Sequence, residues 1–365
     1  MYRIIVSFAA MWAMLPTLLP AEESAARPAL LWRYNAGSAV TAPPACRENR
    51  IAFTTRAGAV ILLDTNGRFQ GTLTARDGTN GPAAFAASPV FAAGRIVVAS
   101  RHGWVSALET NGATAWQYDC GEEIKAAPLV ATDAPVPRLF VLTQASGVVH
   151  CLDAQTGRRI WVSANTGRCE AAAALAAGRI IFGNCEAVIH SFDAATGQAA
   201  GRIALCEECQ VAAGIATDGP LAYVGTRCGT VYCVDVHRGA AVWTNGASRA
   251  ETFTTPALGD RLVVVGSFDG SLYALDRASG ASVWKFPCSG TPGDPVLHNG
   301  DVFFGDRGTL RAVSLASGKE RWSVAITDEI QTPIVFDGRL LVGGDDGSLS
   351  AYRIPPAQDS TPGKP

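Results

Sequence analysis

The sequence predicts an all-β protein whose repeated four-stranded antiparallel units close into a ring. One pattern recurs eight times between residues 58 and 353: a glycine, a short strand, an acidic residue, a turn with a second glycine and usually a tryptophan. Its spacing of about 40 residues is that of one propeller blade. The 38 glycines, 20 prolines and 17% charged residues are typical of many short, well-buried strands. We therefore expect an eight-bladed β-propeller.

Each unit contains the same elements in the same order. In the third unit, residues 128–131, 138–143, 148–153 and 158–162 have the alternation of strands. Asp153 and Gly157 bound the last turn, because aspartate can accept backbone N–H groups and glycine allows positive φ. Trp161 then falls on the outer strand, where its ring can lie between blades. The other copies start at Gly58, Gly103, Glu186, Gly229, Gly270, Gly308 and Gly347.

The N-terminus is expected to supply the strand that the last unit lacks. The third strand of the eighth unit ends near Tyr352, and no outer strand follows it. Residues 30–34, with Trp32 in the middle, have the form of an outer strand. We expect them to complete the eighth blade, because a closed ring leaves no free sheet edge.

Tryptophans at one repeat position are expected to dock neighbouring blades against each other. They are Trp32, Trp116, Trp161, Trp243, Trp284 and Trp322. Two units lack the ring. Gly71 or its neighbour Thr72 takes the position in the first unit, and Gly201 takes it in the fourth. We expect looser blade contacts at these two places.

The fullest copy of the motif is Ala274-Leu-Asp-Arg-Ala-Ser-Gly-Ala-Ser-Val-Trp284. It resembles the tryptophan-docking motif of pyrroloquinoline-quinone-like (PQQ-like) repeat propellers. That family includes the quinoprotein alcohol dehydrogenases and the propeller lipoprotein of the outer-membrane β-barrel assembly machine. The resemblance implies an eight-bladed propeller but no particular activity, because one fold hosts many functions.

The parts of a quinone enzyme that this family would imply are largely missing. Such enzymes hold the cofactor with an adjacent Cys-Cys disulfide and calcium, and this chain has no Cys-Cys dipeptide. The segment Cys206-Glu-Glu-Cys209 is followed by Gln210, where a haem attachment site needs histidine. We identify no catalytic, cofactor-binding or metal-ligating residue. PQQ with calcium is kept as the alternative cofactor prediction.

The two ends of the chain differ from the repeats. Residues 1–21 have the positive start, apolar stretch and small-residue site of a cleaved signal peptide, and the stretch is short for a membrane span. Residues 22–29 are expected to be a linker, residues 30–354 the propeller and residues 355–365 a disordered tail. The first cysteine is Cys46, which argues against a lipid anchor near the cleavage site. We expect an exported protein, periplasmic or extracellular.

Four cysteines form two pairs at matching repeat positions. Aligning the fourth unit on the fifth matches Cys169 with Cys209 and Cys185 with Cys228. In each unit one cysteine precedes the inner strand and the other follows the second strand, so both should lie on one face. We expect disulfides Cys169–Cys185 and Cys209–Cys228 in an exported protein. Free thiols, a four-cysteine metal site and a Cys206–Cys209 loop are the alternatives.

The other polar and sulfur-containing candidates favour structural roles. Cys151 and Cys233 take a small-residue position that other units fill with alanine, and the oxidation state of Cys120 and Cys288 is left open. His150 and His190 share one tolerant position on the third strand, while His102, His237 and His298 fall in loops. The carboxylates that could hold a cation at a channel mouth fit a solvated rim better: Glu122, Glu123, Glu251 and Asp328.

These features together favour a binding protein. Net charge is −2 without a Lys/Arg run, which excludes the electrostatic footprint of a nucleic-acid binder. We expect an exported, monomeric, non-catalytic scaffold that binds a protein, peptide or glycan on its loops. The alternatives are a quinone- or metal-dependent oxidoreductase and a periplasmic outer-membrane protein assembly factor.

Overall fold

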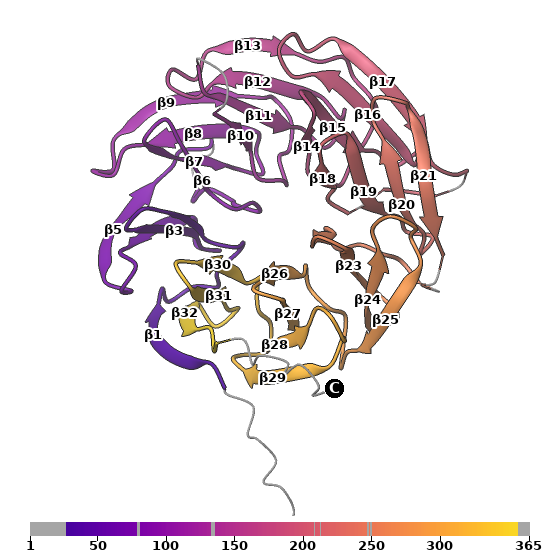
Figure 1. Cartoon of the computed structure of the whole chain (residues 1–365). Coiled ribbons are helices and arrows are strands. Elements are labelled where there is room, and N and C mark those ends of the chain that lie inside the picture. The colour runs from indigo at the N-terminus through magenta and orange to yellow at the C-terminus, as the bar shows by residue number, and fades with distance from the viewer. Residues whose placement is uncertain are drawn as a thin grey trace, which may run out of the picture.

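The structure is a computed structural model that describes residues 27–356, apart from 79–80, 133–135, 208, 212, 247 and 249. The expected signal peptide, residues 22–26 of the expected linker and the tail from 357 lie outside the described residues. The described chain forms eight four-stranded antiparallel sheets arranged in a ring (Figure 1). The predicted eight-bladed β-propeller is confirmed.

The strands of every blade occupy four positions, from the centre of the ring outward. The inner strands are β2 (Ala45–Arg47), β6 (Val90–Ala92), β10 (Leu129–Ala131), β14 (Ala174–Ala176), β18 (Ala216–Asp218), β22 (Ala257–Leu258), β26 (Val296–His298) and β30 (Ile334–Phe336). The second strands are β3 (Arg50–Thr54), β7 (Arg95–Ala99), β11 (Arg138–Leu142), β15 (Arg179–Gly183), β19 (Leu221–Gly225), β23 (Leu262–Ser267), β27 (Asp301–Asp306) and β31 (Arg339–Gly343).

The remaining two positions complete each sheet. The third strands are β4 (Ala59–Leu63), β8 (Trp104–Leu108), β12 (Val149–Asp153), β16 (Val188–Asp193), β20 (Val231–Asp235), β24 (Ser271–Asp276), β28 (Thr309–Ser314) and β32 (Ser348–Arg353). The outer strands are β1 (Ala29–Asn35), β5 (Phe69–Thr74), β9 (Thr114–Asp119), β13 (Arg159–Val162), β17 (Ala199–Ala204), β21 (Ala240–Asn245), β25 (Ser282–Pro287) and β29 (Glu320–Ala325).

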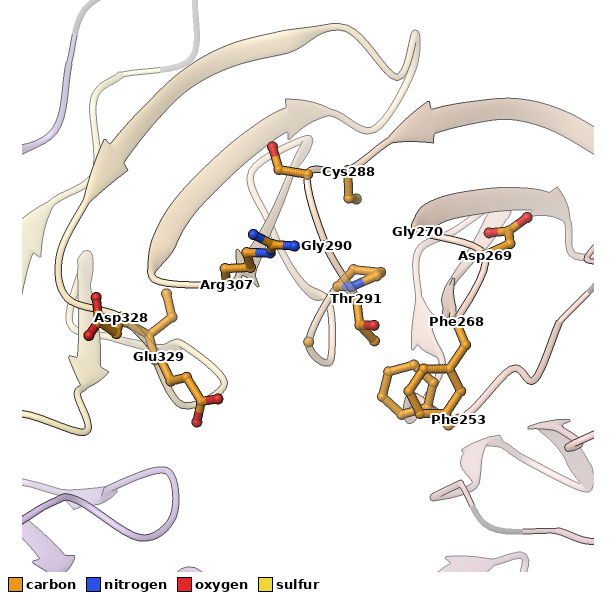
Figure 2. A pocket seen from close by; sticks show the side chains of 15 residues that line it. Phe253, Phe268, Asp269, Gly270, Cys288, Gly290, Thr291, Arg307, Asp328 and Glu329 are labelled. Atoms are coloured by element: carbon orange, nitrogen blue, oxygen red, sulfur yellow. The ribbon is translucent and has the colours of Figure 1, made fainter.

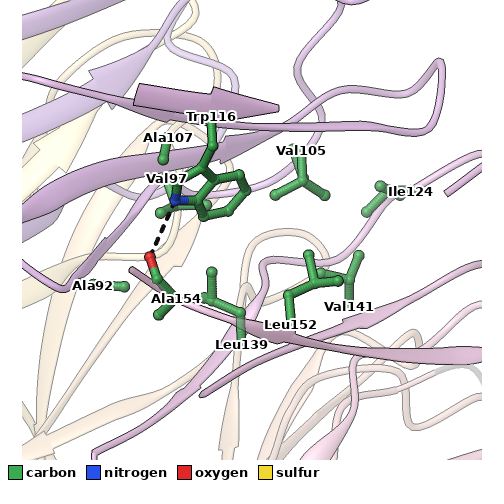
Figure 3. Close-up of a cluster of buried hydrophobic side chains, with 11 residues drawn as sticks. Ala92, Val97, Val105, Ala107, Trp116, Ile124, Leu139, Val141, Leu152 and Ala154 are labelled. Atoms are coloured by element: carbon green, nitrogen blue, oxygen red, sulfur yellow. Dashed lines mark hydrogen bonds between the residues drawn. The ribbon is translucent and has the colours of Figure 1, made fainter. Parts of the chain in front are cut away.

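The hydrophobic core lies between neighbouring blades. Second and third strands are buried along nearly their whole length, as in β7 and β8, because sheets cover both of their faces. Figure 3 shows one such layer, in which Trp116 of one blade packs with Leu139 and Leu152 of the next. No helix among the described residues is long and apolar enough to cross a bilayer.

The N-terminal strand closes the ring as predicted. β1 pairs antiparallel with β32, from Ala29 opposite Arg353 to Asn35 opposite Ser348. The Arg33 Nε also donates a hydrogen bond of 2.9 Å to Ser350 Oγ. The first and last described strands therefore share one blade.

Five of the six docking tryptophans, all except Trp322, cover the turn glycine of the next blade. A Cβ on Gly280 would lie 2.5 Å from the Trp243 ring, and the Trp243 indole donates to the Arg277 carbonyl at 2.8 Å. Trp284 has the same arrangement with Gly318. The turn glycine is thus needed both for its positive φ and for the space that the indole occupies. The same contact joins Trp32 to Gly67, Trp116 to Gly157 and Trp161 to Gly197.

The two positions without tryptophan differ from each other. Gly71, rather than Thr72, takes the first position, because it pairs with Leu62, two residues before the turn aspartate, where other blades pair tryptophan. At the second, where Gly201 stands, the next blade's carbonyl still has a partner: Arg179 Nη1 donates to the Val236 carbonyl at 2.7 Å, as Arg138 does to the Ala194 carbonyl beside Trp161. That carbonyl directly follows the turn aspartate, like the indole acceptors in other blades.

Candidate functional site

Two kinds of loop share one end of every blade. Because the strands alternate in direction, the loops between second and third strands meet those that lead from an outer strand to the next inner strand. We call this end the loop face. The acidic turns with their docking glycines lie on the opposite face.

A pocket of about 870 Å³ opens on the loop face between the blades of β22–β25 and β26–β29. One wall is aromatic. Phe253, which precedes β22, and Phe268, which follows β23, stack with ring centroids 4.0 Å apart and planes at 19°. Figure 2 shows the two rings side by side at one end of the pocket. Phe268 is 51% exposed, so the pair presents apolar surface to solvent.

The other wall carries charge. Arg307 follows β27, and Asp328 and Glu329 lie in the loop between β29 and β30. All three side chains are exposed, and none forms an ion pair within the described part of the chain. In Figure 2 the two carboxylates lie across the pocket from the aromatic rings, with Arg307 between them. The pocket therefore offers unneutralised charges of both signs.

The floor of the pocket is the loop between β25 and β26. The Asp306 carboxylate holds it by accepting the backbone N–H groups of Ser289 and Gly290, each at 2.8 Å. Asp306 is in turn held by Arg311 Nε at 2.8 Å. A Cβ on Gly290 would lie 2.7 Å from the Arg307 side chain, so this glycine allows the arginine to lie against the floor.

Charges on the opposite arc of the loop face are paired with each other. Glu123 contacts Arg101 at 3.0 Å and Lys125 at 3.6 Å. Lys125 also reaches Glu170, and an Arg168 hydrogen bond lowers the pKa of that carboxyl below its ordinary value.

Three of the four rim carboxylates that the sequence analysis considered as cation ligands have partners. Glu122 accepts from Ser146 at 2.6 Å, Glu123 pairs as described, and Glu251 lies 3.9 Å from Arg227.

The fourth, Asp328, lines the pocket. Among the described residues no three His, Cys, Asp or Glu side chains gather in a way that could hold a metal ion. Calcium needs six to eight oxygen ligands. The pocket residues therefore do not fit a quinone held with calcium, and we derive no step through that cofactor.

A family model described as outer membrane protein assembly factor BamB matches residues 68–186, 185–328 and 268–355. The chain belongs to this family. A comparison with curated proteins found no match.

Solved structures share the fold at low sequence identity. BamB from Moraxella catarrhalis superposes with a TM-score of 0.74 at 18% identity, covering 90% of this chain and 100% of that one. Sqt1 of Saccharomyces cerevisiae gives 0.74 at 15%, covering 89% and 99%. Quinohemoprotein alcohol dehydrogenase from Comamonas testosteroni gives 0.71 at 13%, covering 89% and 76%. Such likeness shows the fold alone, because these proteins differ widely in function.

The four cysteines of the two expected disulfides lie in loops of the loop face. Cys209 and Cys228 form a disulfide with a Cα separation of 5.9 Å. Cys169 and Cys185, expected as the equivalent bond, are two free thiols. The reason lies in the orientation of Cys169, whose Sγ donates to the Thr143 carbonyl of the preceding blade at 3.4 Å. Burial raises the pKa of the Cys169 thiol to about 12.

The remaining cysteines are unbonded: Cys46, Cys120, Cys151, Cys206, Cys233 and Cys288. Cys151 and Cys233 are fully buried on third strands beside docking tryptophans, where their small side chains leave space for the ring. The Cys206–Cys209 loop that was the alternative does not form, because Cys209 is bonded to Cys228.

The histidines are not brought together. The Tyr118 hydroxyl lies 3.0 Å from His150 Nδ1, and burial lowers the pKa of His150. His190 stacks on Phe182, and burial lowers its pKa as well. His102 contacts the buried Asp77 carboxylate at 2.7 Å. Each of these rings belongs to a local contact of its own.

Sequence reasoning singled out Asp328 but missed Phe253, Phe268 and Arg307. A comparison of repeats offers a signal. The residue two before the glycine that opens each repeat is arginine in several units, as at Arg101 and Arg227, but phenylalanine, Phe268, in the sixth. An exposed aromatic residue at a position that is arginine in several other units indicates a surface that differs from those units.

Proposed function

We propose that this protein is an exported, monomeric, non-catalytic scaffold that binds a protein partner through the pocket on its loop face. The observation that carries the proposal is the stacked, half-exposed pair Phe253 and Phe268 beside three unpaired charges. Aromatic and arginine side chains dominate the binding energy of protein interfaces. A rigid ring with variable loops is a suitable support for such a surface.

Export is part of the proposal. It is supported by the signal-peptide pattern of residues 1–21 and by the disulfide between Cys209 and Cys228, since disulfides persist mainly in oxidising compartments. A periplasmic or extracellular location follows from both.

Assembly of outer-membrane proteins is the second candidate function. The match to the family described as outer membrane protein assembly factor BamB favours it, and it is a special case of binding on the loop face. The identity of the captured partner separates the two: enrichment of β-barrel assembly components or unassembled β-barrel proteins would support the assembly role.

A capture experiment with matched variants tests the proposal. Tagged full-length protein is incubated with cell-envelope extract, and retained proteins are identified by mass spectrometry. Phe268→Ser removes the exposed ring of the pocket. Phe69→Ser is the control, because Phe69 is a similarly exposed ring, at 53%, on outer strand β5. We expect partners that wild type and Phe69→Ser retain and Phe268→Ser loses. Equal retention by both variants would contradict the proposal.

The oxidoreductase alternative has its own test. The protein is mixed with pyrroloquinoline quinone and calcium, and substrate-dependent dye reduction is followed by absorbance. Reduction above that of the cofactor alone would replace the scaffold proposal with an enzymatic one.

A further inference from the structure

Apart from Asp269, which pairs with Lys285 at 3.2 Å, the aromatic and charged side chains of the pocket form three parts in a fixed order around the ring. Phe253 and Phe268 belong to the blade of β22–β25, Arg307 to the blade of β26–β29, and Asp328 and Glu329 to the loop that enters β30. Because these blades are consecutive, the order is aromatic, cationic, anionic, as the labelled side chains in Figure 2 also show.

The charges of the pocket favour a charged ligand over a neutral one. On the opposite arc of the loop face Arg101, Lys125 and Glu170 take part in ion pairs, whereas Arg307 and the two carboxylates across the pocket have no ion-pair partner among the described residues. The hydroxyl groups of a neutral glycan would hydrogen-bond to these side chains without neutralising them. A ligand with an anionic group for Arg307 and a cationic group for the carboxylates pairs all three parts, and like charges placed together are costly.

The shape of the floor favours an extended chain. Residues 288–293 form a backbone surface with little side-chain cover, including Gly290 and Gly293. Pro292 forms an antiparallel bridge with Asp306, and the N–H of the exposed Thr291 donates no hydrogen bond to the backbone of the described residues. An extended peptide can lie along such a surface and place alternate side chains on one side, about 7 Å apart.

From this juxtaposition we propose that the pocket binds an extended peptide segment of a partner protein, in which an acidic side chain lies between a basic and an aromatic one. The acidic side chain pairs with Arg307, the basic one with Asp328 and Glu329, and the aromatic ring packs on Phe253 and Phe268. This inference rests on the proposed function, and it adds the order of side chains that the partner must present.

Two synthetic peptides of the same composition test the order. The first is Ser-Lys-Ser-Glu-Ser-Phe-Ser and the second Ser-Glu-Ser-Lys-Ser-Phe-Ser, each prepared also in reverse order and each carrying a fluorophore on a terminal linker. Binding to the full-length protein is measured by fluorescence anisotropy at low salt. We expect peptides with the central glutamate to bind at least about fivefold more tightly than peptides with the central lysine.

Two variants locate the effect. Arg307→Glu should abolish the preference, because each peptide then places one charge opposite a partner of opposite sign and one opposite a like charge. Phe268→Ser should weaken both peptides, and Phe69→Ser should change neither. Circular dichroism and thermal melting establish that each variant is folded before it is used. Equal affinity for the two peptide orders, or a preference that Arg307→Glu leaves unchanged, would overturn the proposal.

The outcome is separable from that of the capture experiment. If partner capture depends on Phe268 but the peptides show no preference for order, the peptide inference fails and the scaffold function stands. If capture is the same for Phe268→Ser and Phe69→Ser, the scaffold function itself fails.

Discussion

Replacing a turn glycine by alanine should lower stability in two ways, through the backbone conformation and through a clash with the docking tryptophan. Two glycines of this ring separate these two contributions. Gly280 and Gly239 occupy the same turn position in neighbouring blades, with φ of +74° and +68°. A Cβ on Gly280 would lie 2.5 Å from the Trp243 ring, whereas a Cβ on Gly239 would have no neighbour within 4 Å. The difference arises because Gly201 stands where the preceding blade would otherwise present a tryptophan.

The magnitudes follow from this geometry. A left-handed conformation costs an alanine roughly 1–2 kcal/mol at either site. At Gly280 the added methyl must also displace an indole whose Nε1 donates to the Arg277 carbonyl at 2.8 Å and whose ring packs on Tyr223. Overpacking of this kind typically costs about 1–3 kcal/mol more. We expect Gly280→Ala to lower the free energy of unfolding by about 1–3 kcal/mol more than Gly239→Ala.

Urea unfolding followed by tryptophan fluorescence and by circular dichroism measures the difference. Trp243→Ala should itself cost about 3–5 kcal/mol, as other large-to-small changes in cores do. In that background Gly280→Ala should cost no more than Gly239→Ala does, because the clash is gone. If both glycine variants had the same stability in the wild-type background, the assignment of Trp243 to the docking of the next blade would be refuted.

Three further predictions concern the closure of the ring, the thiols and pH. Deleting residues 22–36 should lower the melting temperature far more than removing the chain from Pro355, because it takes away the strand paired with β32; equal melting temperatures would contradict the closure. Thiol titration of the unfolded, unreduced protein should find eight free groups, whereas six would mean that Cys169 and Cys185 are bonded as well and ten that no disulfide exists. Burial lowers the pKa of His190 below its ordinary value. Below about pH 6.5 this histidine is therefore protonated more readily in the unfolded chain than in the folded protein, and stability should fall as the pH drops. His190→Phe should reduce this loss between pH 7 and 5 in thermal melts; an unchanged slope would exclude His190 as its source.

The fold could be predicted because each blade repeats the residues that determine it. An acidic turn, its glycine and the tryptophan fix the third and outer strands, and the predicted bounds around Trp161 differ from β12 and β13 by one residue. The arginine contacts between blades could not be predicted in this way. Arg179 lies on a different strand from Gly201, and only the three-dimensional arrangement brings it to the Val236 carbonyl, as it brings Arg138 to the Ala194 carbonyl.

The site was harder to predict than the fold for a related reason. Phe253 and Phe268 lie in different loops, and they stack only because the loop before an inner strand meets the loop after a second strand. The cysteines show the same limit. Cys169 matches Cys209 by position, yet a hydrogen bond to the preceding blade turns its sulfur toward Thr143, and repeat alignment carries no information about that contact.

Pairing of β1 with β32 also has a consequence for biosynthesis. The hydrogen bond from Arg33 to Ser350 joins residues 317 positions apart. β1 therefore cannot pair with β32 until almost the whole chain has been synthesised. Contacts of such large sequence separation form late and slow folding. Until then β1 exposes a free edge that can pair with other chains. A chain that ends before Ser348 lacks β32 and cannot close the ring. An incomplete chain therefore keeps the edge of β1 exposed, and a complete chain covers it.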